Sequence, residues 1–162
     1  MTTATRYPEF EVTGPPRELG RQIGEAMREQ IRGFCACAME HVNRTVSISM
    51  ESAIDIAQQS LRFAEAYASE MVEELRGTAE GADVSLDEIM LLQVRNQLQP
   101  HGEGACTSLA AAGPRSRFVA QNWDNDPALD EFNVVITRKT AEKQAGDHHD
   151  RSGGIDSIHW FQ

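Results

Sequence analysis

The feature that most constrains the fold is a pair of apolar stripes with helical spacing in the first half of the chain. Steps of three and four residues place such side chains on one face of a helix, which is typical of a helix packed on a core. The first stripe predicts a helix from Pro16 to Val42 and consists of Leu19, Ile23, Met27, Ile31, Phe34, Ala38 and Val42. The second predicts a helix capped by Ser49 or Ser52 and ended by Gly77 or Gly81, and it consists of Ile54, Ala57, Leu61, Ala64, Ala68, Met71 and Leu75. We expect the two helices to pack against one shared surface.

Shorter signals complete the helical part. Ser85 and Glu88 have the spacing of a capping box, in which the serine reaches forward and the glutamate reaches back. This predicts a third helix from about Leu86 to Leu92. The pair Gly20 and Gly24 lies inside a polar helix with no phosphate-binding loop before it, which favours close packing of two helices over phosphate or membrane contact.

The pattern changes at the glycine-bearing stretch 101–104, which we expect to be flexible. Three β-prone segments follow, Cys106–Ala112, Arg117–Asp124 and Phe132–Thr137, and we predict that they form three antiparallel strands. The remainder, residues 139–162, has no convincing period and is expected to be a loosely ordered tail. The predicted fold class is therefore α+β.

Composition excludes several functions. Fifteen Lys and Arg against 25 Asp and Glu give a net charge of −10, which repels phosphate backbones and anionic lipid heads. No apolar run approaches the roughly 20 residues of a membrane span, and the N-terminus lacks the pattern of a signal peptide. We therefore expect no nucleic-acid partner, no membrane contact and a cytoplasmic location, where the three cysteines stay reduced.

The predicted hairpin brings Cys106 close to a polar side chain. A turn centred on Arg115 pairs Cys106 with Asp124, so that a thiol faces a carboxylate, whereas a turn centred half a residue earlier pairs Cys106 with Trp123. Composition alone favours the alternative that Cys106 is a small buried hydrophobe and Asp124 a turn residue at the end of a strand.

Four motifs resemble one family in its order. They are the segments 14–25 (GPPRELGRQIGE) and 77–95, the run 104–108 (GACTS), and 121–124 (QNWD). Together they resemble the acyl-coenzyme A:6-aminopenicillanic acid acyltransferases, the C45 family of N-terminal-nucleophile (Ntn) hydrolases. The likeness covers about residues 9–138.

The resemblance implies a self-processing cysteine enzyme. Cleavage would fall between Ala105 and Cys106, leaving Cys106 as nucleophile with its own α-amine as base and Asp124 to orient that amine. The family acts on a non-peptide amide or transfers an acyl group from an acyl thioester to an amine. Residues 1–105 would be the helical segment and 106–138 the start of the catalytic sheet of an αββα sandwich. The family's chain continues further and supplies an oxyanion-stabilising asparagine, so we expect a truncated or impaired copy.

Other signals predict no cofactor. Cys35 and Cys37 point about 200° apart on a helix, so that only Cys37 and His41 share a face, and we expect no metal. The alternative to the enzyme hypothesis is a catalytically silent helical interaction module. Open strands also predict self-association, or contact with a missing C-terminal half.

Overall fold

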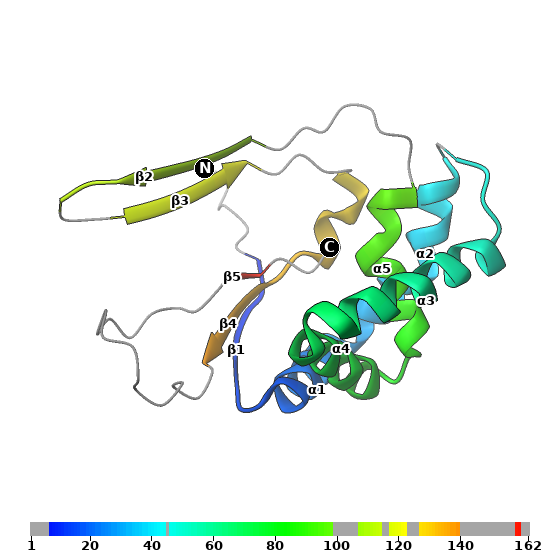
Figure 1. Ribbon diagram of the computed structural model, residues 1–162, viewed down its shortest axis with the longest axis horizontal. Helices are drawn as coiled ribbons and strands as arrows, with labels where there is room; N and C mark the ends of the chain where they lie inside the picture. The colour runs from blue at the N-terminus through cyan, green and yellow to red at the C-terminus, as the bar shows by residue number, and fades with distance from the viewer. Residues whose placement is uncertain are drawn as a thin grey trace, which may run out of the picture.

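The computed structural model describes residues 7–44, 46–98, 107–114, 117–122, 127–139 and 158–159. The helices are α1 (Pro16–Ala26), α2 (Arg28–Asn43), α3 (Met50–Tyr67), α4 (Ser69–Ala82) and α5 (Leu86–Val94), with 3₁₀ turns η1 (Arg95–Leu98) and η2 (Pro127–Phe132). The strands are β1 (Glu9–Thr13), β2 (Thr107–Ala112), β3 (Arg117–Asn122), β4 (Val135–Lys139) and β5 (Ile158–His159). The five helices form one body, with a small sheet beside it and a separate hairpin (Figure 1). The predicted α+β class is confirmed.

Helices α1 and α4 lie in direct backbone contact through four glycines. A Cβ atom at Gly20 would lie 1.8 Å from the backbone oxygen of Glu74, and one at Gly24 would lie 2.3 Å from that of Thr78. From the other side, Gly77 and Gly81 would place a Cβ 2.0 and 2.3 Å from backbone oxygens of α1. Only glycine permits this approach, so the prediction of close helix packing at Gly20 and Gly24 is confirmed.

Each predicted long helix is two helices. The first breaks at Met27, whose backbone has φ −115° and ψ 21°, and the second breaks at Ala68, with φ −149° and ψ 68°. Met27 is itself buried, so the apolar stripe runs through the break without interruption. The breaks let α1 pack along α4 while α3 packs along α5, which one straight pair of helices could not do.

The ends of the helices confirm two caps and correct one. Ser49 caps α3 by accepting a hydrogen bond from the backbone nitrogen of Ser52 at 3.1 Å, and Ser85 and Glu88 form the predicted capping box of α5. However, α4 does not end at Gly77 or Gly81. It continues to Ala82 and is ended by Asp83 in the left-handed conformation, because both glycines are used for packing on α1.

The prediction of three antiparallel strands is confirmed for the first two, which form the hairpin β2–β3, and is wrong for the third. In the described residues the third strand, β4, pairs with two other strands. It is parallel to β1, which precedes the first helix, and antiparallel to β5. The hairpin β2–β3 forms a sheet of its own. Phe132 belongs to η2, and the third predicted strand begins only at Val135. A parallel pair needs a long connection, which here contains all five helices.

The β1–β4 sheet is fastened to the helical body by its inward face. Val12 and Ile136 are fully buried and join the core around Leu19 and Ile23. On the same face, the side chain of Arg138 is only 11% exposed, and its Nε donates to Oε1 of Glu74 on α4 at 3.1 Å. This ion pair therefore bridges the sheet and α4 at the level of the glycine contact.

Within the described ranges, none of the helices is both long enough and apolar enough to cross a membrane.

Candidate functional site

The residues predicted to carry the chemistry, Ala105, Cys106 and Asp124, lie outside the described residues. So do the stretch 101–104 and most of the tail. The described hairpin begins at Thr107 and ends at Asn122, so it contains the two strands that flank the predicted site. The site can therefore be assessed from the strands beside it.

The register of the hairpin differs from the leading prediction by one residue. Thr107 lies opposite Asn122 and Ala112 opposite Arg117, whereas a turn centred on Arg115 would have placed Thr107 opposite Trp123. The observed register corresponds to the alternative turn centred half a residue earlier. Proline is favoured at the second position of a turn, so Pro114 favours a turn whose first residue is Gly113. Gly113 then lies outside the ladder, which ends at the pair of Ala112 and Arg117. The geometric argument that paired Cys106 with Asp124 is therefore wrong in its register.

A side-chain hydrogen bond closes the open end of the hairpin. The backbone nitrogen of Thr107 donates to Oδ1 of Asn122 at 2.6 Å. The residue that follows the predicted nucleophile is thus held by a side chain on the opposite strand. Sequence reasoning did not single out Asn122, although an asparagine at the end of a strand next to a proposed site was visible.

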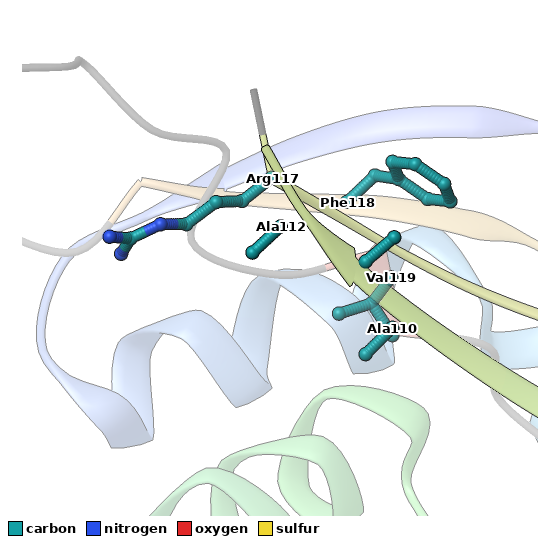
Figure 2. Close-up of a pocket in the computed structure, with 6 residues that line it drawn as sticks. Ala110, Ala112, Arg117, Phe118 and Val119 are labelled. Atoms are coloured by element: carbon teal, nitrogen blue, oxygen red, sulfur yellow. The ribbon is translucent and has the colours of Figure 1, made fainter. Parts of the chain in front are cut away.

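The hairpin is exposed on both faces. Every described residue of β2 and β3 is exposed, including Leu109 at 57%, Phe118 at 53% and Val119 at 79%. A shallow groove of about 420 Å³ lies on it, and its walls are Ala110, Ala111, Ala112, Arg117, Phe118 and Val119. Figure 2 shows Arg117 and Phe118 leaving the hairpin on opposite sides, while Ala110, Ala112 and Val119 present short side chains. The groove is apolar with one cation at its margin.

A polar cluster holds the chain downstream of the hairpin. Asp130 on η2 accepts hydrogen bonds from the hydroxyl of Tyr7 and, at 3.2 Å, from Nδ2 of Asn133. The bond to Asp130 raises the pKa of Tyr7, because ionisation would remove the donated proton. On its other side η2 is anchored by Phe132, whose ring stacks on that of Phe34 with centroids 5.1 Å apart.

The two described cysteines are poor nucleophiles. Burial, together with the nearby charge of Glu88, raises the pKa of Cys35 to about 11. Burial also raises the pKa of Cys37, whose Sγ lies 3.5 Å from the backbone oxygen of Phe34. Both are therefore thiols at neutral pH, and the thiolate is the reactive form. The described ranges contain no cluster of three histidine, cysteine or acidic side chains suited to a metal ion.

A scan against models of known protein families found no match.

Proposed function

We propose that the chain is a self-processing cysteine enzyme of the Ntn type, with Cys106 as the nucleophile. It would hydrolyse a non-peptide amide or transfer an acyl group from an acyl thioester to an amine. The observation that carries the proposal is the antiparallel hairpin that starts at the residue after Cys106 and is closed there by Asn122. A hairpin whose first strand begins at the residue after the proposed nucleophile agrees with the resemblance to the C45 family in segments 104–108 and 121–124.

The chemistry begins with cleavage of the chain. The thiol of Cys106 attacks the carbonyl carbon of Ala105, the C–N bond breaks as a C–S bond forms, and the proton passes to the nitrogen. Water then hydrolyses this thioester and releases the Ala105 carboxylate and the Cys106 thiol, whereas the α-amine of Cys106 is already free once the C–N bond has broken. That amine has an ordinary pKa of about 7.7 to 8.0, so it is a competent general base near neutrality. Asp124 is proposed to orient the amine and to stabilise its ammonium form.

The freed cysteine would act on substrate by the same reaction class. Its thiolate attacks an amide or thioester carbonyl and forms an acyl-thioester, while the leaving amine or thiol takes up the proton. Water resolves this intermediate in a hydrolase, and an acceptor amine resolves it in an acyltransferase. Cys35 and Cys37 do not compete for this role, because their raised pKa values keep both thiols protonated.

The exposed faces of the hairpin support the finer fold proposal. Leu109 and Phe118 lie on one face and Val119 on the other, so both faces are apolar. Strands with two apolar faces belong in a layer that is covered on both sides. The middle layers of an αββα sandwich are covered in this way, one side by helices and the other by the second sheet.

The test is the intact mass of the purified chain after incubation. We expect two fragments separated between Ala105 and Cys106, and a Cys106→Ala variant that stays whole. Cys35→Ala is the matched control and should be cleaved like the wild type, because its thiol is half-buried and protonated. A single species of full mass in the wild type, or cleavage that persists in Cys106→Ala, would overturn the proposal.

The second candidate is a silent interaction module. The observation that favours it is the exposure of Phe63 at 76%, Tyr67 at 92% and Met71 at 66% around the junction of α3 and α4. An exposed patch of large apolar side chains is typical of a surface that contacts another protein. An uncleaved chain that nonetheless binds a partner would favour this candidate.

A further inference from the structure

Most of the exposed large apolar side chains of the described residues fall in two patches. The first is the hairpin groove defined above, which has Val119 and Arg117 on one face of the hairpin and Phe118 on the other. The second, which we name the α3–α4 corner, consists of Phe63, Tyr67 and Met71. Phe63 and Tyr67 lie one turn apart at the end of α3, and Met71 lies in the first turn of α4, beyond the break at Ala68.

We propose that the hairpin groove of one chain binds the α3–α4 corner of a second copy. The two patches complement each other in shape. The corner presents aromatic side chains that project into solvent, with Tyr67 92% exposed. The groove is open and presents the small side chains of Ala110 and Ala112 together with Val119. These small side chains leave the face of the groove accessible to an aromatic ring of the corner.

The two patches also complement each other in charge. Residues 107–122 contain two arginines and no acidic residue, within a chain whose net charge is −10. Around the corner, residues 60–73 contain three glutamates and one arginine. Arg117 borders the groove, and Glu70 is exposed beside the corner. Opposite charges at the rim favour this pairing over groove with groove or corner with corner.

The occupant is a second copy because one chain carries both halves of the contact but does not bring them together. Tyr67 and Val119 are both exposed in the same molecule, so neither patch covers the other. Figure 1 shows the hairpin reaching away from the helical body that carries α3 and α4. Docking would also cover a two-stranded hairpin, which is only marginally stable by itself in water. This inference does not rest on the chemistry proposed at Cys106.

The experiment measures self-association of the full chain by sedimentation velocity over a range of concentrations. One variant alters both faces of the hairpin by Phe118→Thr and Val119→Thr, which keep β-propensity, and another alters the corner by Phe63→Ser and Tyr67→Ser. Each variant alone should associate at least about tenfold more weakly than the wild type, since buried aromatic anchors carry most of the energy of a contact. Met50→Ser removes another exposed apolar side chain outside both patches and should change nothing.

Mixing the two variants distinguishes this docking from other modes of association. Each mixed pair retains one intact groove and one intact corner, so the equimolar mixture should associate more tightly than either variant alone. Pairing of hairpin with hairpin would gain nothing from mixing. In the same way Arg117→Glu should weaken association, and Glu70→Arg added to it should restore association. A wild-type chain that stays monomeric at its highest soluble concentration, or a mixture no tighter than its components, overturns the proposal.

Discussion

Replacing Gly20 with alanine tests the packing on which the helical body depends. The new Cβ would lie 1.8 Å from the backbone oxygen of Glu74 and 2.8 Å from the backbone nitrogen of Thr78. Ordinary contact begins near 3.4 Å, so the atom is about 1.6 Å too close to the oxygen. Backbone atoms cannot rotate away as a side chain can. Helices α1 and α4 must therefore move apart, which also loosens the contacts of Leu19 and Ile23.

Two opposing effects set the size of the change. Alanine is a better helix former than glycine by about 1 kcal/mol. Overpacking a closed contact costs about 1 to 3 kcal/mol and sometimes more, and a clash with backbone belongs at the upper end of that range. We expect Gly20→Ala to lower the free energy of unfolding by about 2 kcal/mol. For a chain of this size, that loss lowers Tm by about 4 to 8 °C.

The assay is urea unfolding followed by circular dichroism at 222 nm, with Gly33→Ala as the matched control. Gly33 also lies inside a helix, but its Cβ would lie 3.1 Å from Cε1 of Phe132, a side-chain atom that can yield. Gly33→Ala should therefore be close to neutral or stabilising. Combining Gly20→Ala with Gly77→Ala should cost less than the two separate losses added, because the first substitution already separates the helices. If Gly20→Ala is as stable as the wild type, the reasoning is refuted.

Two further predictions concern the ion pair and the thiols. Glu74→Ala leaves the charge of Arg138 buried without its carboxylate and should lower the free energy of unfolding by about 3 kcal/mol in the same urea assay. Glu11→Ala, at the exposed pair with Lys139, should lower it by less than about 1 kcal/mol. Similar losses for both variants would contradict this account. Alkylation of Cys35 by iodoacetamide, followed by peptide mapping, should be slow at pH 7.5 and accelerate as the pH approaches its pKa of about 11. Rapid alkylation at pH 7.5 would show that burial does not protect the thiol.

Periodicity predicted the helices correctly but not where they break. The stripe of apolar side chains reports which positions are buried, and Met27 is buried, so nothing in the pattern marks the change of direction there. The stripe also included Met71, which is exposed, while Val72 beside it is buried. The break at Ala68 shifts the buried face by one residue. Such shifts follow from the tertiary contact of α4 with α1, which a local pattern does not contain.

The errors in the β part have a related cause. The strand propensity of residues 132–137 was recognised, but its partner β1 lies more than a hundred residues earlier in the chain. Pairing between distant strands is set by the whole packing of the body, whereas hairpin pairing is set by a local turn. In the hairpin too, the register shifts by one residue according to whether Gly113 belongs to the strand or to the turn. Propensity alone does not decide that choice, although Pro114 favours the turn.

The separation between body and hairpin determines what each experiment can report. Glycine contacts, the buried core and the Arg138–Glu74 pair all lie in the body, so substitutions there act on the unfolding of the whole chain. The described residues of the hairpin are exposed, and substitution of an exposed side chain usually changes the free energy of unfolding by less than about 0.5 kcal/mol. Loss of association in a hairpin variant therefore reports loss of a contact between chains. Loss of cleavage in Cys106→Ala, with an unchanged urea midpoint, would in the same way report loss of chemistry.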